Sequence, residues 1–291
     1  MALPDLLVSA SWMRDRLDEP WLQVADVRWS PDGGFASARR AFEQEGHIPG
    51  AIFVDVDRHL SAPPTGDGRG RHPLPEPETF AETMAALGLD ERKETVVVDD
   101  AQGSLAARLW WMLSVTGRSV ALLDGGLRAW SADDGPLEFG AGPDRPRGTF
   151  HPVSWPDDRI VDADAVEVTI RVKTAPVLDL RVAERYRGEV EPIDPIAGHI
   201  PGAISAPWQD ALDPGTGRFL DPQELRRRFA ELGVTSDAVI CHCGSGVTAC
   251  HGLLALKLAG FGDARLYEGS WSGWISDPSR PVATGNDDDG A

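Results

Sequence analysis

The stretch "CHCGSGVTACH", from Cys241 to His251, contains every cysteine of this 291-residue chain together with two histidines and two glycines. Residues of these types at such short spacing can ligate a metal, form a redox pair, bind a phosphate group or hold a single nucleophilic cysteine. Each possibility predicts a different class of protein. The spacing of the residues and the elements that carry them must decide between the four.

Three of these four chemistries lack part of their usual pattern. A zinc site usually has Cys-x2-Cys and a second ligand pair, whereas this stretch has Cys-x-Cys and the chain offers no second pair. A thioredoxin-like redox pair needs Cys-x-x-Cys, which is absent. A Cys-x5-Arg phosphatase loop starting at Cys243 would need arginine where Ala249 stands. We therefore predict no metal site.

The fourth chemistry fits the predicted local structure. Residues 238–243 are an apolar run typical of a buried strand, and residues 247–260 have the pattern of a helix. The turn between them would direct backbone N–H groups at one point, as an anion-binding nest does. Such a nest favours the thiolate of Cys243, which we predict to be the nucleophile. The residues expected to line the anion site are Gly244, Ser245, Gly246, Val247 and Thr248.

The other two cysteines have simpler interpretations. Cys241 lies inside the predicted strand and resembles a small buried hydrophobic residue, although a regulatory disulfide with a neighbour remains open. Cys250 lies on the predicted helix, where packing is the expected role. The three unevenly spaced cysteines do not form a disulfide framework, so we expect reduced thiols and a cytoplasmic protein.

The chain also repeats itself. "GHIPGAI" begins at Gly46 and again at Gly198, an offset of 152 residues. An Asp-x-Arg segment precedes each copy, ending at Arg28 and Arg181, and the segments "LLDGGLRAW" and "LYEGSWSGW" follow. Three repeats in the same order indicate two copies of one fold. Counting back from the closing tryptophans aligns Cys243 with Asp99, or with Asp100 if one residue is gapped.

Some duplicated residues are expected to be structural. Because His47 and His199 lie in both copies of the Gly-Pro turn, we expect them to hold that turn rather than to react. Arg181 lies in the duplicated Asp-x-Arg segment and has the same interpretation. Chemistry is therefore expected from residues that differ between the copies.

Each copy alternates apolar strands with amphipathic helices, which predicts an α/β fold with a mainly parallel sheet flanked by helices. We predict helices at 106–113 and 221–233 and strands at 96–100, 120–124 and 264–269. The Gly- and Pro-rich stretch 140–157 is the expected linker. The predicted division is a non-catalytic domain at 1–145, a catalytic domain at 156–280 and a flexible acidic tail at 281–291.

Net charge and hydropathy exclude several classes of partner. The formal charge of −18 argues against nucleic acid, which needs a basic binding face. Charges at Asp5 and Arg14 interrupt the N-terminal stretch, so we expect neither a signal peptide nor a membrane span. The expected partners are small molecules and other proteins.

Taken in order, these motifs closely resemble the tandem-domain rhodanese family of sulfurtransferases. The resemblance rests on both GHIPGA segments, "ARLWWML", "RVAERYRG", "CGSGVTA" and "EGSWSGW", and covers roughly residues 6–275. It implies two rhodanese-like domains with an inert first copy. It also implies that a small anionic donor gives sulfur to Cys243 as a persulfide, which passes to cyanide, a small thiol or a thioredoxin-like protein. Neither a metal nor an organic cofactor is implied.

The identity of the donor depends on the loop and its surroundings. The mercaptopyruvate subgroup resembles this chain at Ser245, and no Lys or Arg lies between Cys243 and Lys257, which suits a monoanion better than thiosulfate. Arg185 matches the arginine that binds the donor's anion in this family, and Arg187 is a second candidate. However, Asp194 stands where the mercaptopyruvate subgroup has a further arginine. We favour 3-mercaptopyruvate and keep thiosulfate as the alternative.

The resemblance also implies a proton relay and leaves a different class of function open. Asp57 and His72 match the Asp and His proposed to act with the loop serine in the mercaptopyruvate subgroup, although His72 could equally be structural. Arg69 and Arg71, near that histidine, could attract an anionic substrate. A persulfide carrier or sensor with little turnover is the alternative to an enzyme.

Overall fold

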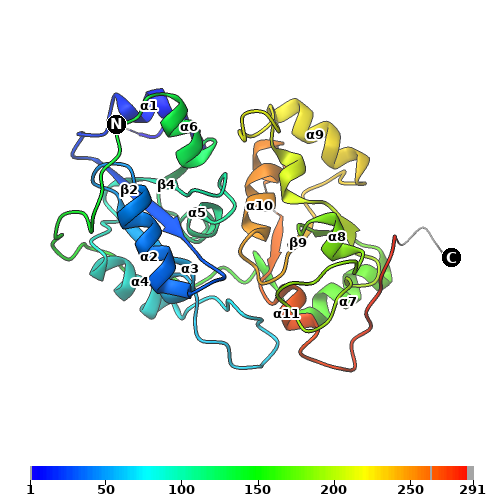
Figure 1. Cartoon of the computed structure of the whole chain (residues 1–291). Helices are drawn as coiled ribbons and strands as arrows, with labels where there is room; N and C mark the ends of the chain where they lie inside the picture. The colour runs from blue at the N-terminus through cyan, green and yellow to red at the C-terminus, as the bar shows by residue number, and fades with distance from the viewer. Residues whose placement is uncertain (1, 263, 287–291) are drawn as a thin grey trace. The chain divides into compact units, whose positions relative to one another are not determined.

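The computed structural model describes residues 2–262 and 264–286, which form two compact units (Figure 1). The first unit contains the residues up to Ala62 and residues 74–155, and the second contains residues 156–213 and those from Leu220 onward. Two short segments belong to the opposite unit. Residues 63–73 pack with the second unit and residues 214–219 with the first. The predicted division at 1–145 and 156–280 did not include this exchange.

The two units contain the same sheet. Five parallel strands follow the order β1-β5-β4-β2-β3 in the first unit and β6-β10-β9-β7-β8 in the second, which confirms the predicted α/β fold with two parallel sheets. The strands of the first sheet are β1 Leu7–Val8, β2 Leu22–Arg28, β3 Ile52–Asp55, β4 Glu94–Val98 and β5 Val120–Leu123. Those of the second are β6 Ile160–Val161, β7 Val177–Asp179, β8 Ile204–Ser205, β9 Ile240–His242 and β10 Arg265–Tyr267.

Helices connect these strands in both units. Helix α9 shows why the predicted boundaries are close to the observed ones, because Asp221 caps it by accepting hydrogen bonds of 3.0 Å from the N–H groups of Gln223 and Glu224. The first unit contains α1 Ala10–Arg14, α2 Gly34–Glu45, α3 Val56–His59, α4 Pro77–Ala86, α5 Ala106–Val115 and α6 Gly126–Ala132. The second contains α7 Ala163–Val172, α8 Ala183–Tyr186, the 3-10 helix η1 Trp208–Ala211, α9 Pro222–Glu231, α10 Ala249–Leu258 and α11 Ser270–Trp274.

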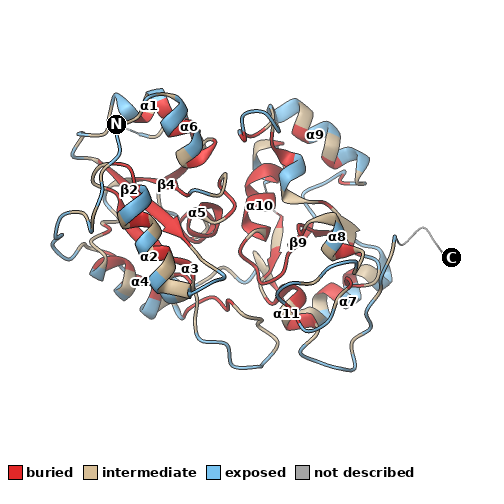
Figure 2. Ribbon diagram, viewed as in Figure 1, coloured by how far each residue is buried: buried red, intermediate tan, exposed pale blue. Residues whose placement is uncertain are grey.

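The central strands and the helices that follow them are buried nearly throughout (Figure 2). Every residue of β9 is buried, as is every residue of α5 from Ala106 to Leu113 and of α10 from Ala249 to Leu256. Strands covered on both faces are continuous apolar runs, which is the pattern of their sequences. The loops that follow β4 and β9 are therefore anchored at both ends in well-packed elements.

The duplicated Asp-x-Arg segments fix the duplicated Gly-Pro turns. Arg28 donates from Nη2 to the carbonyl oxygen of Gly46 over 3.2 Å, and Arg181 donates from Nη2 to that of Gly198 over 2.7 Å. The aspartate of each segment accepts further hydrogen bonds from its arginine. A buried guanidinium thus pairs with a carboxylate and satisfies a turn carbonyl, which is the structural role expected of Arg181.

The turn histidines have matching environments in the two units. His47 stacks on Phe42 with ring centroids 3.7 Å apart, and His199 stacks on Tyr186 at 3.8 Å. Each donates from Nδ1 to the carbonyl oxygen of the residue on which it stacks, over 3.0 and 2.8 Å. Both histidines hold the turn.

The C-terminal stretch differs in part from its prediction. The sequence predicts a flexible tail at 281–291, but Ala283 exchanges two backbone hydrogen bonds with His199, of 2.8 and 3.0 Å. The rest of the predicted tail, 287–291, lies outside the described residues. Within 2–262 and 264–286, no helix is both long and apolar enough to cross a bilayer.

Candidate active site

Cys243 is the first residue after β9, and its backbone is held by α11. The residue is only 2% exposed. Its N–H donates to Oγ of Ser270 over 3.1 Å, and its carbonyl oxygen accepts from the N–H of Trp271 over 2.9 Å. Ser270 in turn donates to the carbonyl oxygen of Tyr267. The cysteine is therefore held at the carboxyl end of a central strand, where parallel sheets bind ligands.

The loop after Cys243 presents unused backbone donors. Among the described residues, no protein acceptor meets the N–H groups of Gly244, Ser245, Val247 or Thr248. Gly246 has φ +80°, a conformation that favours glycine and turns the loop towards α10. Several unpaired N–H groups before a helix are the feature that an anion site requires, and the site itself stays a prediction.

The other two cysteines lie in different surroundings. Cys241 is fully buried within β9, and burial raises the pKa of its thiol far above the ordinary value. Cys250 donates from Sγ to the carbonyl oxygen of Gly246 over 3.4 Å. None of the three cysteines, all within the described residues, forms a disulfide bond. Of the three, Cys243 alone opens the loop.

The structure brings Ser245 and His72 together. Their Oγ and Nδ1 atoms share a hydrogen bond of 2.7 Å, and both residues are buried. His72 lies in the segment 63–73, which belongs to the second unit although it precedes the linker. Asp57, the third predicted member of the relay, lies on α3 in the first unit and accepts a 3.0 Å hydrogen bond from Nε1 of Trp29.

Arg185, on α8, directs one guanidinium nitrogen at the loop. Its Nε and Nη2 donate to Glu191 over 3.1 and 2.7 Å, and Nη2 also donates to Asp194 over 3.0 Å. Because Nη1 has no acceptor among the described residues, it remains available to a ligand. Arg187 differs, since it donates to Glu189 through Nε and Nη2, over 2.7 and 2.9 Å.

A second guanidinium, that of Arg71, lies beside the same loop. A β-carbon placed on Gly244 would lie 3.4 Å from Nη2 of Arg71 and 3.5 Å from both terminal nitrogens of Arg185. The N–H of Arg71 donates to Oγ of Ser272 over 3.1 Å, and Ser272 itself donates its N–H to the carbonyl oxygen of Gly244. The absence of a side chain at position 244 thus leaves room where two arginines meet.

Two acidic residues pair with these arginines: Asp194, which the sequence showed only as the replacement of an arginine, and Glu191, which was not predicted. Although burial opposes it, the hydrogen bonds from Arg185 and from backbone N–H groups hold the pKa of Glu191 below its ordinary value. Burial raises the pKa of Asp194, while Arg71 opposes that rise. Both are ion-paired, which satisfies buried carboxylates. Both lie on a Pro-rich loop, where no periodicity shows which side chains point inward.

In the first unit, the corresponding loop encloses its own carboxylate. Asp99 is the first residue after β4, as Cys243 is after β9, which supports the predicted alignment of the two. Its Oδ1 accepts from the N–H groups of Ala101 and Gly103, over 3.0 and 2.7 Å. Its Oδ2 accepts from those of Leu105 and Ala106, both over 2.8 Å. The anion site of this loop is occupied by the protein itself.

Comparison with protein families identifies this duplicated architecture. The profile of the Rhodanese-like domain matches residues 9–133 and 162–277. The chain belongs to the rhodanese family.

Full-length relatives of this rhodanese chain carry two different names. A probable 3-mercaptopyruvate sulfurtransferase of Pseudomonas aeruginosa is 47% identical, with 96% of this chain and 98% of that protein covered. A putative thiosulfate sulfurtransferase of Mycobacterium tuberculosis is 40% identical, with 91% of each covered. The crystal structure of SseA from Escherichia coli, a mercaptopyruvate enzyme with the rhodanese fold, is 36% identical with a TM-score of 0.78 and covers 92% of this chain and 99% of its own.

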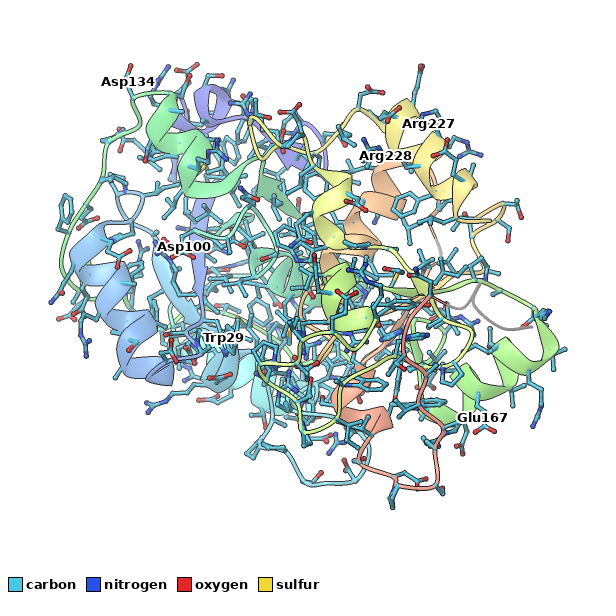
Figure 3. All side chains as sticks on the ribbon, turned by 45° about the vertical axis from the view of Figure 1, so that its right-hand side comes forward. Trp29, Asp100, Asp134, Glu167, Arg227 and Arg228 are labelled. Atoms are coloured by element: carbon cyan, nitrogen blue, oxygen red, sulfur yellow. The ribbon has the colours of Figure 1, made fainter. Side chains whose placement is uncertain are left out.

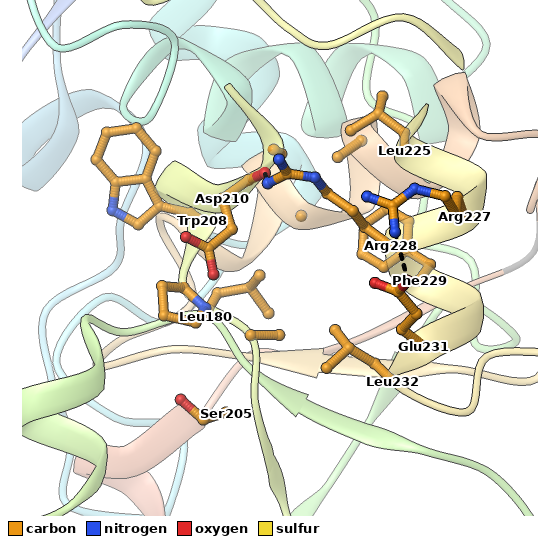
Figure 4. Close-up of a pocket in the computed structure, with 15 residues that line it drawn as sticks. Leu180, Ser205, Trp208, Asp210, Leu225, Arg227, Arg228, Phe229, Glu231 and Leu232 are labelled. Carbon is orange, nitrogen blue, oxygen red and sulfur yellow. Dashed lines mark hydrogen bonds and ion pairs between the residues drawn. The ribbon is translucent and has the colours of Figure 1, made fainter. Parts of the chain in front are cut away.

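The second rhodanese domain also contains a cavity of about 270 Å³ between η1, α9 and α10 (Figure 4). Its lining includes Leu180, Trp208 and Phe229 but no cysteine. Arg227 and Arg228, on α9 (Figure 3), also line it and are paired with Glu224. We therefore place the candidate active site at the Cys243 loop, which does not line this cavity.

Proposed function

We propose that this sulfurtransferase takes a sulfur atom from 3-mercaptopyruvate, holds it as a persulfide on Cys243 and passes it to a thiophilic acceptor. The observation that carries the proposal is the loop after Cys243, where the N–H groups of Gly244, Ser245, Val247 and Thr248 have no protein acceptor among the described residues. The names of the Pseudomonas and Escherichia relatives support the same donor.

In the first half-reaction, the thiolate of Cys243 attacks the donor sulfur and forms an S–S bond. The carbon–sulfur bond of mercaptopyruvate breaks, and its electron pair passes to the enolate of pyruvate. The donor thiol loses one proton and the enolate gains one, so the products are pyruvate and a persulfide anion. The loop N–H groups stabilise both the thiolate and the persulfide, because each is an anion at the same place.

The Ser245–His72 pair is the proposed route for that proton. A hydroxyl hydrogen-bonded to imidazole over 2.7 Å can donate to the enolate while the ring replaces its proton. Asp57 stays a predicted member of this relay.

In the second half-reaction, an acceptor thiolate or cyanide attacks the outer sulfur of the persulfide. The S–S bond breaks, and its electron pair restores the thiolate of Cys243. A small thiol or a thioredoxin-like protein in the cytoplasm is the acceptor we propose. The chemistry of both steps needs no metal or organic cofactor.

The choice of donor depends on charge around the loop. No Lys or Arg lies between Cys243 and Lys257, so the loop itself offers only backbone dipoles to the donor. Arg185 offers Nη1 at the edge of the loop, where a carboxylate can accept it. Thiosulfate is the second candidate, favoured by the name of the Mycobacterium relative.

Intact-mass spectrometry tests the proposal. After incubation with mercaptopyruvate and removal of excess donor, the protein should gain about 32 Da, one sulfur atom, and lose it on addition of cyanide. Cys243→Ser should gain nothing, whereas the matched variant Cys241→Ser should still be labelled. Sulfur uptake by Cys243→Ser but not by Cys241→Ser would show that the wrong thiol has been chosen.

A kinetic comparison separates the alternatives. The ratio of kcat/KM for mercaptopyruvate and thiosulfate identifies the donor, and we expect it to favour mercaptopyruvate. A carrier or sensor would take up one sulfur per chain and then turn over slowly with every acceptor supplied. Multiple turnovers with cyanide would exclude that alternative.

A further inference from the structure

Arg71 occupies an unusual position in the chain. It precedes the linker by many residues, yet its segment, 63–73, packs within the second unit. Gly70 lies so close to this unit that a β-carbon there would come within 2.4 Å of the carbonyl oxygen of Gly269. The backbone of Arg71 is fixed by its hydrogen bond to Ser272. Its guanidinium therefore has a defined place beside the loop that starts at Cys243.

Asp194 connects the two arginines of the site. Its Oδ1 pairs with Nη1 of Arg71, and its Oδ2 accepts from Nη2 of Arg185 over 3.0 Å. The carboxylate is only 2% exposed. One buried carboxylate thus binds a terminal nitrogen of each guanidinium, which leaves Nη2 of Arg71 and Nη1 of Arg185 without acceptors among the described residues.

These two remaining nitrogens converge. Both lie within 3.5 Å of the place that a side chain on Gly244 would fill. A planar carboxylate has two oxygens, each of which can accept from one guanidinium. Two guanidinium nitrogens beside Gly244 can thus share one carboxylate, next to the residue that follows Cys243.

We propose that Arg71 is the second guanidinium of the donor site and that Asp194 is the residue that positions it. This inference rests on the proposed function, and it assigns the donor's carboxylate to the Arg71–Arg185 pair. Asp194 stands where the mercaptopyruvate subgroup has an arginine. In this chain its role would be to orient the two guanidinium groups of Arg71 and Arg185.

The balance of charge gives the pair a preference. Arg71 and Arg185 face two buried carboxylates, Glu191 and Asp194, so the group has no net charge before the donor binds. One added negative charge is met by the two free N–H donors, whereas the second charge of thiosulfate has no partner there. The arrangement thus selects a monoanionic donor.

A purely structural role for Arg71 makes a different prediction. If its only function were to hold the segment 63–73, loss of the side chain would displace His72 and slow the reaction of every donor. A role in binding the carboxylate affects only donors that carry one. The two roles can be separated by a donor that lacks the carboxylate.

The experiment compares 3-mercaptopyruvate with mercaptoacetone, which has the same thiol and ketone but no carboxylate. In Arg71→Ala, kcat/KM for mercaptopyruvate should fall roughly 10- to 100-fold, mostly through KM, because a charge-assisted hydrogen bond is lost. Mercaptoacetone should react at a rate within about twofold of the wild-type rate. Arg71→Lys should recover part of the loss, because a point charge replaces the fork.

Two control variants define the outcomes. Arg227→Ala removes the same charge from α9 of the same unit and should change neither donor. Arg69→Ala removes a neighbouring charge that is paired with Asp67, so an equal loss there would indicate general attraction and overturn the inference. An equal fall for both donors in Arg71→Ala would assign it a structural role and also overturn it.

Asp194→Asn tests the positioning role. It should raise KM for mercaptopyruvate about tenfold and add little when combined with Arg71→Ala, because both changes remove one interaction. Additive losses would contradict the inference. If the wild-type protein takes no sulfur from mercaptopyruvate, the proposed function fails together with the inference. If the wild type reacts normally and Arg71→Ala does too, only the inference fails.

Discussion

The loops after β4 and β9 have the same place in the fold but opposite relations to anions. In the first unit, four backbone N–H groups bind the carboxylate of Asp99, which permanently fills the nest. In the second, Cys243 begins the loop, and the N–H groups of Gly244, Ser245, Val247 and Thr248 have no acceptor within the described part of the chain. The two loops therefore differ in whether the protein itself supplies the anion that their backbone N–H groups can bind.

The aspartates of the duplicated Asp-x-Arg segments also differ, in the direction in which their pKa values are shifted. Burial raises the pKa of Asp26 to about 6, and the neighbouring carboxylates of Asp99 and Asp100 add to the rise. The corresponding Asp179 is equally buried, but His242 and Arg181 lower its pKa below the ordinary value. The buried aspartate of the first unit thus lies near further carboxylates, whereas that of the second lies near Arg181 and His242.

The largest expected effect comes from the nucleophile. Cys243→Ser should reduce sulfur transfer on the order of 10³-fold or more, because a hydroxyl neither ionises nor accepts sulfur. The free energy of unfolding should change by less than about 1 kcal/mol, since Ser is close in size to Cys. Steady-state kinetics and urea unfolding measure the two effects. A large loss of stability would show that the side chain of Cys243 stabilises the loop, which we do not expect.

Asp99→Ala should instead lower the free energy of unfolding and leave sulfur uptake by the folded protein intact. Removal of the carboxylate leaves four backbone N–H groups without acceptors inside the first unit, at a cost of about 3–5 kcal/mol in the free energy of unfolding. Asp99→Asn keeps one carbonyl oxygen and should cost about half as much. Urea unfolding tests both variants, and sulfur uptake by Cys243 should persist in the folded protein. A cost below that of Cys243→Ser would remove the distinction between the loops.

Glycines in the two loops provide a more balanced comparison. Gly103 and Gly246 have φ +89° and +80°, so alanine at either position should cost about 1–2 kcal/mol of unfolding free energy. Only Gly246→Ala should also slow sulfur uptake, about tenfold, because only its loop binds a reacting anion. Single-turnover mass spectrometry detects this difference. Equal activity of the two variants would indicate that the shape of the Cys243 loop does not matter to the reaction.

The smallest effect concerns acid. His59, in α3, accepts the N–H of Asp55 over 2.9 Å, and burial lowers its pKa from 6.5 to about 4. As the pH falls, His59 is protonated in the unfolded chain before it is protonated in the folded protein. Its contribution to the free energy of unfolding is therefore fully present above pH 6.5 and is lost as the pH falls towards 4. Between pH 7 and pH 5 the wild type should lose about 1–2 kcal/mol more than His59→Gln.

The two units differ at this position, because the repeat offset of 152 residues aligns His59 with Ala211 in η1. His59→Gln should therefore protect the first unit from acid and leave the second unchanged, where burial also lowers the pKa of His242. Amide hydrogen exchange in β4 and β9 at pH 5 measures the two effects. Equal protection of β4 and β9 by His59→Gln would contradict this expectation.

The sequence predicted what the repeat and local patterns determine. The parallel sheets, the helices after β4 and β9, the equivalence of Asp99 and Cys243 and the proximity of Ser245 and His72 all follow from motifs that are aligned or occur together. The pairing of Arg71 with Asp194 was not predicted, because 123 residues separate the partners and no periodicity relates them. Ser270 was also missed, since a serine at φ +52° that orients a cysteine has no local signature.

The exchange of the segments 63–73 and 214–219 has a consequence for dividing the protein. A fragment that begins after the linker would contain Cys243 and the whole second sheet, but neither His72 nor Arg71. A cut at the apparent boundary would thus separate the cysteine from groups that surround it in the folded chain. The two repeats therefore cannot be exchanged as independent domains. A chimera of this protein needs junctions at Ala62, Leu74, Pro214 and Leu220 as well as in the linker.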